Sequence, residues 1–342
     1  MKGVEFLNTP LMIDTYLPPI ENNPGISHPA KIIASDGKTY FLKGNMSKDN
    51  DNNKLFHMDA ALAQEALSYR IANFFNIPTP QIVYIKITED DLVNFPKLRF
   101  VHNFQKPGLY LASENTGSSE LNKEFRQYYY FYSLGFPGND FHGFLSRIQN
   151  KEDISKIIYF DILIANIDRY KNPGNLIFKD VGDGNIMLAI DFGYSFFGPY
   201  WSAHKYYPNI KKEELLHHNY PNGLATSWPQ FILQKMNLLG QQSSNSIFDA
   251  LSKFIVFKEN PFLKSNNRAH ELSNNILTKL INEIPNEWFV QGEYQKNMYL
   301  QFISSQIKLM PSIIDYLVSA KNLNNSNGGK LKWETGKNII SL

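Results

Sequence analysis

The chain has 342 residues, of which 43% are hydrophobic and 19% charged, a globular balance that allows one large or two medium domains with a substantial core. The formal net charge of +2 argues against bulk binding to nucleic acid or to an anionic membrane, and the lack of cysteine excludes disulfides, thiolate metal sites and a cysteine nucleophile. No signal-peptide core or membrane-length apolar run is present, so we expect a cytoplasmic protein.

The N-terminal region begins with a proline-interrupted arm and a polar loop at residues 21–29. This loop contains Gly25 and Ser27 and precedes a predicted hairpin. A glycine-containing turn between strands can present backbone N–H groups to phosphates. Gly25 and Ser27 are therefore candidate nucleotide contacts, with a plain surface loop as the alternative.

The hairpin spans residues 31–43 around Asp36-Gly37, a dipeptide typical of tight turns. Alternation along its second strand places Phe41 and Lys43 on one face, which we expect to be buried. A buried lysine needs an anion, and the phosphates of a nucleotide are one. The alternative is a solvated lysine at a strand end.

Residues 57–75 predict a helix that Asn76-Ile-Pro ends. Glu65 is the only acidic residue between Ala60 and Pro78, so it is the candidate partner for Lys43. A solvent-exposed glutamate is the alternative.

Three strands are predicted next, at residues 81–88, 98–104 and 108–114, the last leading into the C-terminal region. An aromatic cluster follows at 124–134. Few basic residues interleave it, which favours packing over nucleic-acid stacking.

The most informative stretch runs from residue 154 to residue 193. Apolar periodicity predicts a helix over 154–165, with Asn150 as its N-cap, and two short apolar runs around 180–184 predict a hairpin. Asp168 and Asn175 lie in the loop between the helix and the hairpin, and Asp191 follows the second strand.

This order of side chains suits phosphoryl transfer, which needs a carboxylate for the attacking hydroxyl, oxygen ligands for Mg²⁺ and a cation on the phosphates. Asp168 supplies the carboxylate for the hydroxyl. Asn175 and Asp191 supply oxygen ligands for the metal, because Mg²⁺ prefers one or two carboxylates plus phosphate oxygens. The alternative is an Asx-rich loop with Asp191 as a capping acid.

These motifs resemble the HipA-like kinases, in particular their compact kinase-domain branch. The resemblance rests on Asn-Ile-Asp-Arg at 166–169, Asn-Leu at 175–176 and Ile-Asp-Phe-Gly-Tyr-Ser-Phe at 190–196, and it covers roughly residues 20–200. It implies an α+β, bilobal protein-kinase-like fold. The N-lobe, residues 1–110, would be mostly antiparallel sheet with one helix, and the C-lobe, residues 111–342, mostly helical.

The resemblance also implies ATP and Mg²⁺, with Asp168 as catalytic base, Lys43 on the phosphates and Glu65 orienting it. It suggests a Ser/Thr protein acceptor, a possible antitoxin-like partner and a phosphorylatable serine at Ser27. Asn175 and Asp191 would hold the metal.

Two departures from the family pattern are visible. Tyr170 stands where the family has histidine, and Asn175 lies seven residues after Asp168, as if two residues were inserted at 171–174. We predict that the insertion loops outward with Asn172, because a residue before proline is extended and Pro-Gly is a turn pair.

The remainder predicts a packed aromatic segment at 196–207, with phosphate acceptance or substrate gating as alternatives. Helices are predicted at 211–218, 227–238, 244–257, 268–283 and 294–318. Two other functions stay open: a nucleotide-binding pseudokinase that binds a partner protein, and a small-molecule or lipid kinase.

Overall fold

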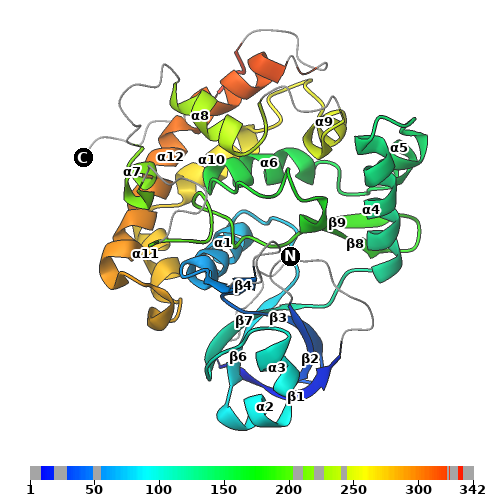
Figure 1. Cartoon of the computed structure of the whole chain (residues 1–342). Coiled ribbons are helices and arrows are strands. Elements are labelled where there is room, and N and C mark those ends of the chain that lie inside the picture. The colour runs from blue at the N-terminus through cyan, green and yellow to red at the C-terminus, as the bar shows by residue number, and fades with distance from the viewer. Residues whose placement is uncertain are drawn as a thin grey trace.

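The structure is a computed structural model that describes residues 9–18, 29–48, 55–202, 211–218, 227–239, 245–321, 323 and 330–333. Most strands lie in the N-terminal part and most helices in the C-terminal part, so the fold has the predicted α+β organisation. In Figure 1 the barrel strands lie at one end of the molecule with α2 and α3, and most helices lie at the other end with β8 and β9; α1 lies between the two ends.

The N-terminal part is built mainly from strands. Its strands are β1 (Leu11–Leu17), β2 (Ala30–Ala34), β3 (Thr39–Lys43), β4 (Met46–Lys48), β5 (Leu55–His57), β6 (Ile82–Ile87) and β7 (Gly108–Glu114). Its helices are α1 (Ala61–Phe74), α2 (Glu89–Asn94) and α3 (Pro96–Phe100).

The C-terminal part is mostly helical and contains one hairpin. Its helices are α4 (Ser119–Ser133), α5 (Asn139–Ser146), α6 (Asp153–Leu163), α7 (Lys212–Leu216), α8 (Trp228–Lys235), α9 (Ile247–Ser252), α10 (Leu263–Glu271), α11 (Asn274–Asn282) and α12 (Gly292–Lys321). The hairpin strands are β8 (Leu176–Asp180) and β9 (Asn185–Ala189), and the 3-10 turns are η1 (Pro173–Asn175) and η2 (Asn286–Trp288).

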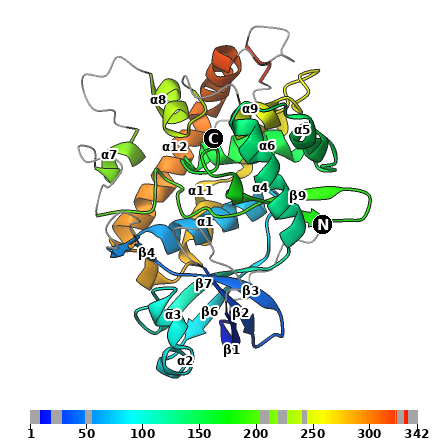
Figure 2. The ribbon, with the colours of Figure 1, turned by 45° about the vertical axis from the view of Figure 1, so that its right-hand side comes forward.

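Five strands close into a barrel in the order β1-β2-β3-β7-β6 (Figure 2). Neighbouring strands pair antiparallel, except that β1 and β6 pair parallel, with Leu11 opposite Ile85. The interior is aliphatic: Ile32, Leu42 and Ala112 are fully buried. The closure was not predicted, because no local pattern identifies a partner strand so far along the chain.

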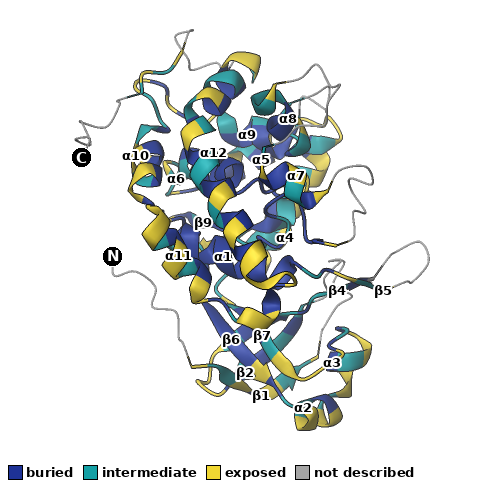
Figure 3. Ribbon diagram, turned by 90° about the vertical axis from the view of Figure 1, so that its left-hand side faces the viewer, coloured by how far each residue is buried: buried dark blue, intermediate teal, exposed yellow. Residues whose placement is uncertain are grey.

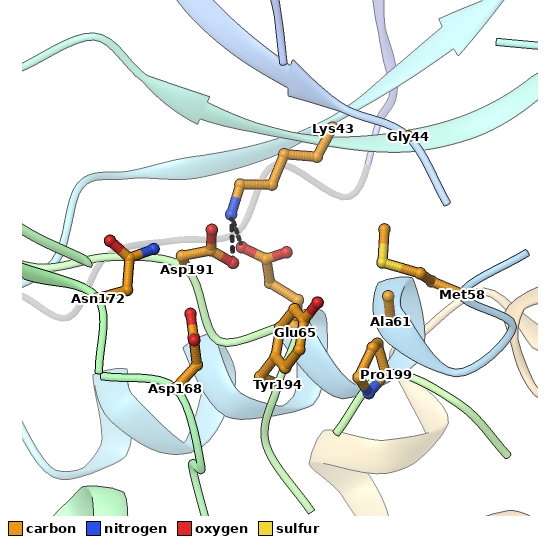
Figure 4. Close-up of a pocket in the computed structure, with 11 residues that line it drawn as sticks. Lys43, Gly44, Met58, Ala61, Glu65, Asp168, Asn172, Asp191, Tyr194 and Pro199 are labelled. Carbon is orange, nitrogen blue, oxygen red and sulfur yellow. Dashed lines mark hydrogen bonds and ion pairs between the residues drawn. The ribbon is translucent and has the colours of Figure 1, made fainter. Parts of the chain in front are cut away.

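The predicted hairpin before Lys43 is present as β2 and β3, and Gly37 in its turn has φ +79°, which a side chain would oppose. Tyr40 and Leu42 point into the barrel, so Phe41 and Lys43 share the outer face of β3. That face is only partly buried, and Lys43 extends from it toward α1 (Figure 4). The predicted alternation is therefore right. The barrel core lies on the opposite face, but the Lys43 side chain is still only 12% exposed because it packs against α1.

Helix α1 is buried on almost every side, since each residue from Ala61 to Ala72 is buried. It begins at Ala61 rather than His57, because His57 is extended and pairs with Met46 in the separate β4–β5 hairpin. The predicted end is correct: Asn76 has φ 53° and stops the helix.

The strand predicted over 98–104 is wrong, because this region contains α3 and a turn. Thr88 caps α2 by accepting from the backbone N–H of Asp91, whose carboxylate accepts from the N–H of Thr88. Pro96 then starts α3. Proline favours the first position of a helix, and at Pro96 this preference outweighed the strand propensity of the residues that follow.

Strand β7 runs through the predicted boundary at residue 110 and ends at Glu114, where the chain passes to α4. The predicted aromatic packing holds for the inner side of α4, where Phe125 contacts the rings of Phe141, Phe144 and Phe178. Figure 3 shows the barrel strands β6 and β7 largely buried and much of α2 and α3 exposed.

The predicted C-terminal helices are present with altered bounds. The segment predicted as one helix over 268–283 is two helices, α10 and α11, because Ser273 caps a new helix by accepting from the N–H of Ile276. The N-cap of α6 is Glu152 rather than Asn150, whose amide binds Met187 in β9 instead. Within the described ranges, no helix is long and apolar enough to cross a membrane.

Candidate active site

Lys43 and Glu65 form a buried ion pair between the barrel and α1. Lys43 comes from the end of β3 and Glu65 from the second turn of α1, and Lys43 Nζ lies 2.5 Å from Glu65 Oε1. Their side chains are 12% and 5% exposed. The predicted ion pair between Lys43 and Glu65 is therefore present in the structure.

Asp191 joins this pair from the segment after β9. Its Oδ1 lies 3.1 Å from Lys43 Nζ, and its side chain is 31% exposed (Figure 4). Asp191 has a left-handed φ of 59°, which costs backbone energy and needs support from surrounding contacts. One cation thus contacts two carboxylates from separate elements.

Burial and the neighbouring charges shift the pKa values of Lys43 and Glu65. Burial alone would lower the pKa of Lys43, but the charges of Asp191 and Glu65 outweigh it and raise that pKa. Burial raises the pKa of Glu65 to about 7 although Lys43 opposes the shift. Lys43 is therefore held as a cation, and Asp191 is the carboxylate that a ligand reaches more easily.

Asp168 lies across the pocket from Lys43 (Figure 4). Asn175 Nδ2 donates to Asp168 Oδ2 over 2.8 Å, which fixes the direction of the carboxylate. Burial raises the pKa of Asp168, against the hydrogen bond from Asn175, so the carboxylate is a stronger base than in water.

The loop that carries Asp168 is organised around the buried carboxylate of Asp161 in α6. Arg169 Nε donates to Asp161 Oδ2 over 2.8 Å, and Asn166 Nδ2 donates to Asp161 Oδ1 over 3.1 Å. Asn166 Oδ1 accepts from the backbone N–H of Asp168 over 3.2 Å. Asp161 and Arg169 are both 0% exposed, so a solvent-free ion pair supports the loop.

Arg169 also ties this loop to the end of the hairpin. Its Nη1 donates to the backbone oxygens of Asn175 over 2.6 Å and Ile190 over 2.7 Å. Its guanidinium lies 4.7 Å from the ring centre of Phe192. The positions of the loop and of the residues around Asp191 are therefore coupled.

Tyr170, the departure from the histidine of the family pattern, points away from the pocket. It is 2% exposed, and its hydroxyl donates to Asp161 Oδ2 over 3.2 Å. Its ring packs edge-on against Phe248. This departure changes the support of the loop and leaves the pocket wall unaltered.

The inserted residues behave differently from the prediction. Asn172 is extended before Pro173, as expected, but its Oδ1 accepts from the N–H of Gly174 over 3.0 Å. Asn172 lines the pocket together with Asp168 (Figure 4), whereas Asn175 is not a lining residue and its side-chain amide donates to Asp168. Asn172 is exposed, as the outward loop predicts, but its side chain also lines the pocket, which the prediction did not include.

The pocket combines charged and apolar walls (Figure 4). It is lined by Lys43, Gly44, Met58, Ala61, Glu65, Asp168, Asn172, Asp191, Gly193, Tyr194 and Pro199. The charged residues gather around Lys43, and Met58, Ala61 and Pro199 form the apolar side. Residues that lie far apart in the sequence, from Lys43 to Pro199, thus line one cavity.

The oxygen donors fit a Mg²⁺ ion shared with a phosphate. Asp191 offers an accessible carboxylate, and Asn175 Oδ1 makes no hydrogen bond with any residue that the structure describes. No group of three His, Cys, Asp or Glu in the described ranges could hold a metal alone. Phosphate oxygens would have to complete the ligand set.

Two candidate residues cannot be placed. Gly25 and Ser27 lie between β1 and β2, outside the described residues. Their predicted contact with phosphates stays a prediction.

Tyr69 and Gln64 were not singled out from the sequence. The hydroxyl of Tyr69 is buried with no hydrogen-bond partner among the described residues, and it lies near enough to Lys43 and Glu65 for their charges to act on its pKa, which burial raises. Its position one helical turn after Glu65 is a signal that could have identified it. Gln64, beside Glu65, looks like an ordinary helix residue in the sequence.

No protein-family model matches the chain, and no curated protein matches it. Among solved structures, it is similar to the crystal structure of the Helicobacter pylori proinflammatory kinase CtkA, with a TM-score of 0.48 and 12% identity. The match covers 89% of this chain and 98% of that chain. A likeness this distant assigns no role to any residue, so the roles below come from the site's own geometry.

Proposed function

We propose that the protein is an ATP- and Mg²⁺-dependent kinase of HipA-like type. The observation that carries this proposal is the meeting of Lys43, Glu65 and Asp191 in one pocket with Asp168. A paired lysine, a metal-binding carboxylate and a separate, partly buried base are the parts that phosphoryl transfer requires.

In this proposal Lys43 binds the ATP phosphates, and Glu65 holds the ammonium group in place. Asp191 and Asn175 would hold Mg²⁺, which neutralises charge on the β- and γ-phosphates when bound. Asp191 already contacts Lys43, so the metal ligand and the phosphate-binding cation are positioned together.

Asp168 acts on the acceptor. It orients the hydroxyl and takes its proton as the hydroxyl oxygen bonds to the γ-phosphorus and the bond to the bridging oxygen of ADP breaks. Asn175 holds the Asp168 carboxylate in that direction. The resemblance to HipA-like kinases makes Ser or Thr of a protein the proposed acceptor.

A nucleotide-binding pseudokinase is the second candidate. The insertion at residues 171–174 favours it, because Asn172 rather than Asn175 lies in the pocket wall. Tyr170 does not favour it, since its side chain supports Asp161 and stays clear of the pocket.

Labelled ATP separates these functions. The protein is incubated with γ-labelled ATP and Mg²⁺, with and without cell lysate, and labelled products are identified by mass spectrometry. A kinase transfers label, and Asp168→Asn lowers the transfer rate by roughly 10²–10⁴ while retaining nucleotide affinity. A protein that binds ATP without transferring label to any acceptor is the pseudokinase.

Nucleotide binding is tested independently by thermal shift. ATP–Mg²⁺ at about 100 times its Kd should add about 2.7 kcal/mol to the free energy of unfolding. The absence of any shift with ATP, ADP or analogues at millimolar concentration would contradict both candidates.

A further inference from the structure

Residues 193–202, the segment that follows Asp191, lie against the start of α1. The backbone N–H of Ala60 donates to the oxygen of Pro199 over 2.9 Å. The carboxylate of Asp59 accepts from the N–H groups of Trp201 over 2.6 Å and Ser202 over 3.2 Å. Residues 193–202 and α1 are thus joined at the start of the helix.

Gln64 makes the central contacts between the two. In the amide orientation that satisfies its neighbours, its nitrogen donates to the backbone oxygens of Gly198 over 2.9 Å and Ser195 over 3.2 Å. Its oxygen accepts from Lys212 Nζ over 2.6 Å and from the Tyr299 hydroxyl over 3.1 Å. This fully buried side chain therefore bonds the segment, α7 and α12 at once.

Lys212 is the second part of the contact. It is 1% exposed and also donates to the backbone oxygen of Gly198, near the carboxylate of Asp59. Burying a lysine costs free energy, and burial lowers the pKa of Lys212 to about 7 against the opposing charges of Asp59 and Glu213. A surface residue at this position would avoid that cost.

The backbone of the segment is strained where Gln64 holds it. Phe196 and Phe197 have φ values of 53° and 65°, which bulky residues rarely adopt. Such conformations persist only where surrounding contacts determine them. The bonds from Gln64 to Ser195 and Gly198 lie on either side of the two phenylalanines.

These contacts act directly beside the phosphate-binding charges. Gln64 precedes Glu65, and Ser195 lies just beyond Gly193, where an added Cβ would stand 3.5 Å from Glu65 Oε2. A shift of the segment relative to α1 would therefore separate Glu65 from Asp191. Lys43 needs both carboxylates in place.

We propose that Gln64 and Lys212 form a buried lock that holds residues 193–202 on α1, and that Gln64 is thereby a positioning residue for Lys43, Glu65 and Asp191. The positioning half of this proposal rests on the proposed nucleotide site. The lock itself is a property of the fold and is testable without any ligand.

Gln64→Leu is the main variant, and Gln306→Leu is its control. Gln306 is also a fully buried glutamine, but it bonds Ile162, Trp228 and His218 and no residue of the segment. It reaches the segment only indirectly, through the ring of Trp228 beside Phe197. Lys212→Met is the second lock variant, and it serves if Gln64→Leu does not fold.

Hydrogen exchange of the full-length protein without ligand tests the lock. In Gln64→Leu or Lys212→Met the amides of residues 195–202 should exchange about tenfold faster, because their local opening becomes easier. In Gln306→Leu those amides should exchange as in the wild type. Unchanged exchange in both lock variants overturns the lock.

The affinity for ATP–Mg²⁺ tests the positioning role. Gln64→Leu should weaken it about tenfold, and Gln306→Leu should leave it unchanged even if its melting temperature falls equally. Faster exchange with unaltered affinity overturns the positioning role alone. A wild-type protein that binds no nucleotide overturns the proposed function and the positioning role with it, while the exchange result still decides the lock.

Discussion

The barrel and the loop that carries Asp168 are both buried, but different forces hold them. Aliphatic side chains such as Ile32 and Ile85 fill the barrel, whereas the loop is organised by the ion pair of Asp161 and Arg169. Apolar packing is non-directional, and hydrogen bonds fix direction. The barrel therefore supplies a stable platform, and the loop sets the direction of the Asp168 side chain.

The largest test of this difference is Asp161→Asn. It leaves Arg169 as an unpaired buried charge, and we expect a loss of about 3–5 kcal/mol in the free energy of unfolding. Activity should fall further than stability explains, because the loop loses its organising carboxylate. Urea unfolding and kinase assays well below the melting temperature measure the two effects.

Ile85→Ala in the barrel is the matched control, with an expected cost of about 2–5 kcal/mol. Its activity below the melting temperature should match that of the wild type. Equal activity losses in Asp161→Asn and Ile85→Ala would remove the distinction between platform and loop.

Asn175→Ala sharpens the comparison inside the loop. It removes the amide that directs Asp168 and a proposed Mg²⁺ ligand, so kcat should fall roughly 10–100-fold and the half-saturating Mg²⁺ concentration should rise. Asn172→Ala should have a smaller effect on both. The reverse order would assign the metal to Asn172, which already lies in the pocket wall.

The helical part contains a further buried ionisable group, Lys212, which makes the free energy of unfolding depend on pH. Its pKa is about 7 in the folded protein and 10.5 when unperturbed, so the unfolded chain binds more protons between these values. The free energy of unfolding should therefore rise with pH in this window, by at most about 1.4 kcal/mol per pH unit, and this contribution should be constant below it.

Lys212→Met removes that slope. Urea unfolding at pH 7, 8 and 9 compares the wild type with this variant. The neighbouring charges of Asp59 and Glu213 oppose the lowering of the Lys212 pKa. Parallel pH profiles for wild type and variant would mean that Lys212 keeps an ordinary pKa.

Tyr69→Phe is the smallest expected change. It removes a buried hydroxyl that has no partner among the described residues, so stability should rise by about 1 kcal/mol or less. Thermal unfolding measures the change. A lower melting temperature would show that the hydroxyl has a partner, such as an ordered water molecule.

The sequence was most informative where local rules decide the structure. Turn chemistry at Asp36-Gly37 and strand alternation predicted the position of Lys43, and Glu65 was the only acid available in its helix. The capping-box spacing of Thr88 and Asp91 indicates α2, and Pro96 indicates the start of α3, whereas the strand propensity of residues 98–104 predicted a strand there.

Other features depend on contacts between distant segments. Lys212 lies among Lys211, Glu213 and Glu214, which is a typical surface pattern, but contacts with distant residues such as Gly198 and Gln64 bury it. The place of Asn172 likewise depends on how its turn meets the pocket. Local sequence patterns do not specify contacts between segments that are far apart in the chain.

The parallel pairing of β1 with β6 has a consequence for the order of folding. The strands β2 and β3 can pair as soon as they are synthesised, but the barrel cannot close before β7 ends at Glu114. At about 5–20 residues per second, β1 waits roughly 5–20 s for that part of the chain. During this interval β1 has an unpaired edge, so the N-terminal strand is the barrel strand most exposed to wrong pairing while the chain is being made.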